Sequence, residues 1–201
     1  MTMKTLVLML WLGLLVTGIA ALFWYNEWKY TIPTPVPEHY RPVSTGVAIS
    51  LPHNFASETG KPLFIHFFNP DCPCSKFNVP YFKTLVKDYS SKVDFAIVVL
   101  NNSRYTGDEI RDKFHLNIPV SFDSSVAAAC GVYSTPQAVL LDKSRKLYYR
   151  GNYNRSRYCT EKKTAYARQA IDGLLNTNHN IFFDQFALKA YGCELPNCTK
   201  Q

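Results

Sequence analysis

The chain has 201 residues, of which 47% are hydrophobic and 18% are charged, and its formal net charge is +7. This length favours one domain with additional segments over two full domains, and this composition excludes a largely disordered chain. A basic chain can bind nucleic acid, and basic residues alternate with tyrosines in "KLYYRGNYNRSRYC". We interpret this stretch as a strand that enters a turn.

The first predicted element is a membrane helix. Residues 5–25 form an unbroken apolar run without charge, long enough to cross a bilayer, and aromatic residues mark its far end. A cleavable signal peptide is the alternative, with a small-x-small site at residues 18–20. The bulky residues that follow favour a retained anchor over residues 1–28. Either way the rest of the chain is exported, so we expect no nucleic-acid partner.

The remaining chain divides into three parts by composition. Residues 29–42 contain four prolines, and proline at this density acts as a stiff, extended spacer. Residues 43–178 carry the alternating patterns of a folded domain. Residues 179–201 form a tail with two cysteines.

The folded domain is predicted to alternate strands with helices. Near-continuous apolar runs indicate buried strands at 62–68 and 93–100, and apolar residues at helical spacing indicate a helix from 72 to about 89. The other expected elements are a strand at 43–51, short helices at 107–114 and 124–130, an antiparallel strand pair at 137–142 and 146–150, and a closing helix at 162–175. This order predicts an α/β fold, with a central mixed sheet flanked by helices.

The stretch "HFFNPDCPCSKFNVP", residues 66–80, holds two of the six cysteines where a buried strand ends and a helix begins. Pro73 suits the first helical position because it has a fixed φ and no N–H. Cys72 therefore lies where unpaired backbone N–H groups and the helix dipole favour the thiolate, the form that attacks disulfides or binds metals. Cys74 lies in the first turn of the same helix.

This stretch resembles the active-site segment of the thioredoxin superfamily, which has an aromatic strand, a cysteine motif and a helix with a kinking proline. With residues 67–68 and Pro80 as anchors, the two sequences align without a gap. The resemblance implies that Cys72 is the nucleophile and that Ser75 occupies the slot of the resolving cysteine. The motif then reads Cys-Pro-Cys-Ser, with Cys74 inside it.

A second marker is "CGVYSTPQAVLLD", residues 130–142, which resembles the cis-proline loop of the same superfamily. It implies a cis bond between Thr135 and Pro136 and a role for both residues in binding the substrate's backbone opposite the nucleophile. The buried acid of many thioredoxins corresponds to His66, a candidate proton relay. The similarity covers roughly residues 60–176 and implies a thioredoxin-like fold.

The tail motif "YGCELP" is similar to the Gly-Cys ending of some membrane-associated, peroxiredoxin-related thioredoxins. Asn69, however, stands where peroxiredoxins place a threonine three residues before their reactive cysteine. This difference argues against peroxide as the main substrate.

The sequence leaves three thiol routes open. A Cys-x-Cys disulfide between Cys72 and Cys74 is ranked first, Cys72 acting alone second, and Cys193 or Cys198 as a remote resolving thiol third. Cys159, Cys193 and Cys198 are also candidates for structural disulfides, because the connectivity of six cysteines cannot be deduced from sequence alone.

These features predict a membrane-tethered thiol–disulfide oxidoreductase, reductase-like or isomerase-like, on the periplasmic side of a bacterial inner membrane. Its partners would be protein thiol or disulfide clients and a redox donor or acceptor, and we expect no resident metal or organic cofactor. One alternative is a copper-handling protein, in which the two close thiolates and His66 or His115 hold Cu(I). Another is a non-enzymatic assembly factor, which Ser75 in the resolving slot would suit.

Overall fold

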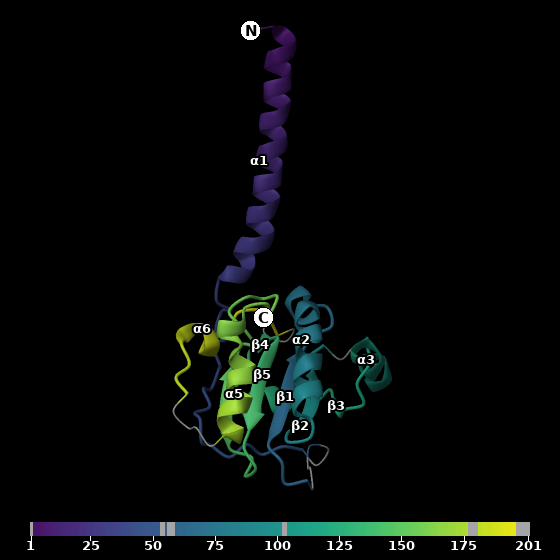
Figure 1. Cartoon of the computed structure of the whole chain (residues 1–201), viewed down its shortest axis with the longest axis vertical. Coiled ribbons are helices and arrows are strands. Elements are labelled where there is room, and N and C mark those ends of the chain that lie inside the picture. The colour runs from purple at the N-terminus through teal and green to yellow at the C-terminus, as the bar shows by residue number, and fades with distance from the viewer. Residues whose placement is uncertain (1, 53–54, 56–58, 102–103, 177–180, 196–201) are drawn as a thin grey trace. The chain divides into compact units, whose positions relative to one another are not determined.

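The computed structural model describes residues 2–52, 55, 59–101, 104–176 and 181–195 (Figure 1). It comprises two compact units, which divide between Pro33 and Thr34. The first unit is an N-terminal helix, and the second is the folded domain that carries the cysteines.

The N-terminal unit is a single helix, α1 (Met3–Thr31). Its segment Met3–Tyr25 is long and apolar enough to cross a membrane. Its 23 residues span about 35 Å at about 1.5 Å each, against an apolar bilayer core of about 30 Å. The expected apolar helix is therefore confirmed. It ends at Thr31 because Pro33 favours an extended conformation for the preceding Ile32, which has φ −87° and ψ 136°.

The folded domain is built on a mixed five-stranded sheet with the order β3-β2-β1-β5-β6. Strands β1, β2 and β3 are parallel, and β5 runs antiparallel to both β1 and β6. The bounds are β1 (Leu63–Phe68), β2 (Asp94–Val99), β3 (Val120–Ser121), β5 (Gln137–Leu141) and β6 (Leu147–Gly151). Every residue of β1 and β5 is buried, which explains their nearly continuous apolar sequences.

Helices cover both faces of this sheet. They are α2 (Pro73–Tyr89), α3 (Gly107–Phe114), α4 (Ser125–Cys130), the 3-10 helix η2 (Lys162–Thr164), α5 (Tyr166–Leu175) and α6 (Gln185–Leu188). Buried side chains of α2, α3 and α5 share a cluster with Phe64 and Phe68 of β1, whereas α4 shares a second cluster with Ile65 and Phe67. Alternate strand residues point to opposite faces, so the clusters lie on opposite sides of the sheet. The thioredoxin-like fold is thereby confirmed.

Parts of the domain differ from the sequence-based expectation. Residues 43–51 are not a strand in the described chain; Gly46 turns the backbone with φ 84°, and Ala48 makes an isolated bridge to Lys146. The expected closing helix at 162–175 is interrupted between η2 and α5. Three short features carry no periodic pattern and were not expected: β3, α6, and a ribbon of β4 (Ser134–Thr135) and β7 (Cys193–Glu194).

Segments outside the expected borders of the domain pack onto it. Thr34 N donates to Ala190 O at 2.9 Å, which joins the proline-rich segment to the tail. Tyr40 Oη donates to Gly131 O at 3.0 Å. The segment at 29–42 is thus divided between α1 and the domain, and the described part of the tail belongs to the domain.

Candidate active site

The site lies where β1 ends and α2 begins. Between them Asn69 forms a tight turn: its carbonyl accepts from Cys72 N at 3.1 Å, and its side-chain Oδ1 accepts from Asp71 N at 2.9 Å. Cys72 is the N-cap of α2, with φ −82° and ψ 123°, and Pro73 starts the helix. The backbone thus places the Cys72 sulfur at a helix N-terminus, where a thiolate is favoured.

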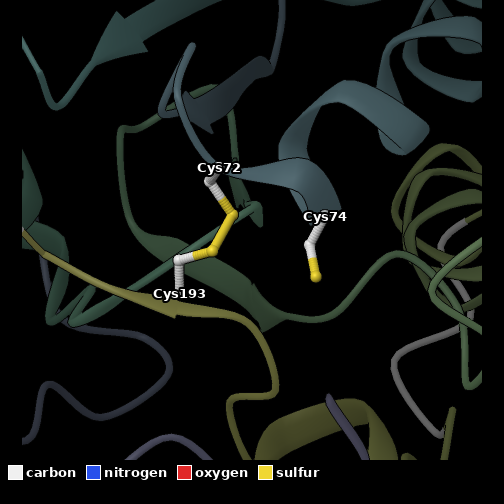
Figure 2. Close-up of side chains that lie close together, drawn as sticks. All are labelled: Cys72, Cys74 and Cys193. Carbon is white, nitrogen blue, oxygen red and sulfur yellow. A yellow bond between two sulfur atoms is a disulfide. The ribbon is translucent and has the colours of Figure 1, made fainter. Parts of the chain in front are cut away.

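Cys72 is joined to Cys193 by a disulfide across 121 residues of sequence, with a Cα–Cα distance of 6.2 Å (Figure 2). The tail cysteine that the sequence ranked last as a partner is therefore the one bonded to Cys72. The first-ranked bond between Cys72 and Cys74 is not present, because Cys72 is bonded to Cys193. Cys198 itself lies outside the described residues.

Cys74 lies beside this disulfide as a third, buried sulfur (Figure 2). The three sulfur atoms of Cys72, Cys74 and Cys193 all lie within 4.8 Å of one another. Thiol–disulfide exchange proceeds by attack of a thiolate on a disulfide sulfur. Cys74 therefore lies close enough to the disulfide to be a second candidate partner of Cys72.

The same three sulfurs are the candidate metal ligands among the described residues. Three close thiolates would suit a soft ion such as Cu(I), once the disulfide had been reduced. The ligand set proposed from the sequence is corrected in one respect: this cluster contains Cys193, and neither His66 nor His115 belongs to it.

The cis-proline loop faces the disulfide. The bond between Thr135 and Pro136 is cis, as expected from the sequence. Thr135 O lies 3.6 Å from Cys72 Sγ, and the Thr135 backbone pairs with Cys193 in the β4–β7 ribbon. The loop thus touches both sulfur-bearing residues of the disulfide.

Ser75 and His66 are the other predicted site residues. Both are buried, and both lie within a few residues of the Asn69 turn in the sequence. Ser75 Oγ accepts from Asn69 N at 3.3 Å, so the residue in the resolving slot helps to hold the turn before Cys72. His66 is packed among aromatic rings and stacks on Phe82 with a centroid distance of 4.4 Å. Its Nδ1 lies 2.6 Å from Tyr153 Oη.

Burial lowers the pKa of His66 from its ordinary 6.5 to about 3. At neutral pH the ring is therefore neutral, and it is a weak base. This environment favours a packing role for His66, and its role as a proton relay stays a prediction.

The low pKa of His66 predicts a specific loss of stability in acid. The unfolded chain binds a proton at this residue below about pH 6.5 and the folded chain does not, so stability falls as the pH drops from about 6.5 towards 3. Because of this residue, the free energy of unfolding should be lower at pH 4 than at pH 7 by on the order of 3 kcal/mol. Urea unfolding at both pH values should show a smaller loss for His66→Gln than for the wild type. Equal losses would mean that another group causes the acid sensitivity.

Cys130 and Cys159 lie outside the disulfide. Burial raises the pKa of each thiol to about 12, so both stay protonated and unreactive at neutral pH. Cys159 Sγ accepts from Asn78 Nδ2 at 3.1 Å. Cys159 is a free cysteine in this structure, so the structural disulfide suggested for it from the sequence is not present there.

Two residues of the site were missed by sequence reasoning. Thr34 comes from the proline-rich segment, yet its Oγ1 lies 2.9 Å from Ser134 Oγ and donates to Gly192 O at 3.2 Å. Gly192 lies directly before Cys193, and its closeness to β4 was not expected. The sequence signal for Gly192 was its position next to a cysteine in the tail. No pattern in the sequence pointed to Thr34.

Several solved structures resemble this fold, and two of them align over most of this chain. A hypothetical protein from Sinorhizobium meliloti aligns with a TM-score of 0.60 and 19% identity over 78% of this chain and 96% of its own. An uncharacterised conserved protein from Geobacillus kaustophilus aligns with a TM-score of 0.60 and 19% identity over 82% of this chain and 97% of its own. At this identity, the similarity shows a shared fold.

A third structure, a thioredoxin-like protein in its oxidised form, aligns more loosely, with a TM-score of 0.45 and 20% identity over 70% of this chain and 96% of its own. A search of curated proteins finds no match. The profile of one protein family, described as a domain of unknown function (DUF6436), matches residues 42–195. This range covers most of the folded domain, including both partners of the disulfide. The chain therefore belongs to the DUF6436 family.

Proposed function

We propose that this protein is a thiol–disulfide oxidoreductase that acts on protein disulfides through Cys72. One observation carries the proposal: the sulfur of Cys72 lies at the N-terminus of α2, within 4.8 Å of two other cysteine sulfurs and 3.6 Å from the backbone of the cis-proline loop. A structural disulfide needs only its two partners. A third thiol beside the disulfide can attack it and replace one of the two bonded cysteines.

The reductive direction of the proposed reaction balances as follows. A donor dithiol first reduces the bond between Cys72 and Cys193, giving two thiols and an oxidised donor. The Cys72 thiolate then attacks one sulfur of the client disulfide, and the other client sulfur leaves as a thiolate. A second thiol of the site attacks Cys72 Sγ and releases the remaining client sulfur. The client gains two electrons, and the site is oxidised again.

We propose that the domain is held on the periplasmic side of a bacterial inner membrane by α1. The apolar segment Met3–Tyr25 supports a membrane anchor. A disulfide between two residues of the domain suits an oxidising compartment, because cytosolic thiols are kept reduced. A tether would keep the enzyme next to membrane-bound electron donors and exported clients.

The proposal is tested by turnover of a peptide disulfide. The full-length protein in detergent should accelerate the reduction by dithiothreitol of a disulfide-bonded dimer of the peptide Tyr-Gly-Cys-Glu-Leu, which has the sequence of the tail, measured as the appearance of the monomer. A non-enzymatic assembly factor would leave the rate at the background of dithiothreitol alone, and that outcome would refute the proposal.

A further inference from the structure

The tail of this chain is seated on the cis-proline loop as a short extended strand. In the β4–β7 ribbon, Ser134 pairs with Glu194 and Thr135 pairs with Cys193, in antiparallel register. The bond from Cys193 to Cys72 then fixes this strand to the proposed nucleophile. A segment of the protein's own chain thus lies, backbone paired and disulfide linked, against the reacting sulfur.

Gly192 allows this close approach. A Cβ at this position would lie 2.3 Å from Thr135 O and 2.9 Å from Ser134 Oγ. Carbon and oxygen atoms at 2.3 Å overlap severely, since non-bonded heavy atoms prefer about 3.5–4.0 Å. Any side chain in place of glycine would therefore push the strand away from β4 and move Cys193 away from Cys72.

Buried hydroxyl groups hold the backbone of the same segment. Thr34 Oγ1 donates to Gly192 O at 3.2 Å, and Ser134 Oγ donates to Cys193 O at 3.2 Å. Both side chains are almost completely buried, with exposed fractions of 5% and 0%. These contacts recognise main-chain carbonyls, so they would accept another extended peptide equally well.

We propose that the edge of β4 (Ser134–Thr135) that pairs with β7 in this structure, here called the docking edge, binds an extended segment of a client protein in which glycine directly precedes the reacting cysteine. Residues 191–195 are the chain's own occupant of this edge. This inference rests on the proposed function and adds to it the class of client that the site selects. The selection comes from the backbone clash at the position of Gly192, which a client residue would share.

Attack by Cys74 on the disulfide releases the tail from the docking edge. Its thiolate attacks Cys72 Sγ, a bond forms between Cys72 and Cys74, and the bond to Cys193 breaks. Cys193 leaves as a thiolate and takes up a proton, Cys74 having released one, and no electrons are gained or lost overall. The remaining ribbon has only two residues in each strand, too few to hold the tail by itself. The tail then leaves, and the donor dithiol of the proposed reaction reduces the bond between Cys72 and Cys74, which gives two thiols and an oxidised donor and prepares Cys72 for a client.

The test uses the full-length Cys74→Ser/Cys193→Ser variant, in which Cys72 is the reacting thiol of the site. Two peptides based on the tail, Tyr-Gly-Cys-Glu-Leu and Tyr-Ala-Cys-Glu-Leu, carry a nitrothiobenzoate group on their cysteine, and its release is followed by absorbance. Each rate is divided by the rate of the same peptide with glutathione, which removes differences in intrinsic reactivity. N-acetylcysteine with the same leaving group serves as the control without a preceding residue.

The glycine peptide should react at least about tenfold faster than the alanine peptide, corresponding to about 1.4 kcal/mol. Equal normalised rates for the two peptides, with N-acetylcysteine reacting normally, would overturn the inference and leave the proposed function intact. Failure of Cys72 to react with any of the three compounds would overturn the proposed function and the inference with it.

A second measurement avoids the double variant. In the otherwise wild-type chain, Gly192→Ala should open the bond between Cys72 and Cys193 at a reductant concentration at least about tenfold lower than in the wild type. Tyr191→Ala, which changes the neighbouring side chain without adding a Cβ, is the matched control. Its bond between Cys72 and Cys193 should be reduced at the same reductant concentration as in the wild type. If the bond in Gly192→Ala is also reduced at the wild-type reductant concentration, the close approach of Gly192 does not control docking and the inference is wrong.

Discussion

Replacing Cys72 with serine should abolish the acceleration of peptide-disulfide reduction and return the rate to the background of dithiothreitol alone. A serine hydroxyl is not ionised at neutral pH and does not attack disulfides, so neither the mixed disulfide nor its resolution can form. Cys130 and Cys159, the described cysteines outside the site, cannot take over this role. Cys130 and Cys159 are held protonated by burial, which raises the pKa of each to about 12.

Cys159→Ser is the matched control for this experiment. It removes one thiol from the same domain but leaves the disulfide and Cys74 unchanged, so its rate should equal that of the wild type. A Cys72→Ser protein that is as active as the wild type would show that Cys72 is not the nucleophile.

The same assay separates the two resolving thiols. If a client occupies the docking edge, Cys193 is displaced from it and Cys74 remains next to Cys72. Cys74→Ser should therefore accumulate the mixed disulfide between Cys72 and the client, and Cys193→Ser should not. Accumulation in Cys193→Ser alone would assign the resolving role to the tail.

Removing the disulfide should cause the second large effect, on stability. The bond between Cys72 and Cys193 closes a loop across 121 residues, and cross-links of this length restrict the unfolded chain by about 5 kcal/mol in the chain-entropy treatment. Measured losses for single disulfides are commonly about 2–5 kcal/mol. Cys193→Ser should therefore lower the free energy of unfolding of the oxidised protein by about 2–5 kcal/mol.

Urea unfolding with and without dithiothreitol checks this expectation. The reductant should lower the midpoint of the wild type to that of Cys193→Ser and should leave the variant unchanged. Equal midpoints for the oxidised wild type and the variant would show that the bond does not restrain the unfolded chain.

The elements that position the nucleophile could be predicted from the sequence because their signals are local. The apolar run of β1 and the proline at the start of α2 fix the place of Cys72 within a few residues. Helix α3 was predicted with its observed bounds, and it begins with a capping box in which Thr106 and Glu109 exchange hydrogen bonds. The cis-proline loop also has a local signature, Thr135-Pro136 before a buried strand.

The partner of Cys72 could not be predicted because it depends on contacts distant in sequence. The β4–β7 ribbon has two residues in each strand, which is too short for any periodic pattern. The pairing that brings Cys193 to Cys72 also requires the close approach of Gly192, which exists only in three dimensions. For the same reason the sequence did not show that aromatic rings surround His66 and keep it neutral.

Disulfide mapping by mass spectrometry, across a series of glutathione redox buffers and on the native protein, tests the proposed redox site. The bond between Cys72 and Cys193 should open and re-form reversibly while the domain stays folded. A fraction bonded between Cys72 and Cys74 should appear at intermediate buffers, and Cys130 and Cys159 should remain thiols throughout. A bond between Cys72 and Cys193 that persists in every buffer until the protein unfolds would make it a structural disulfide and would contradict the proposed function.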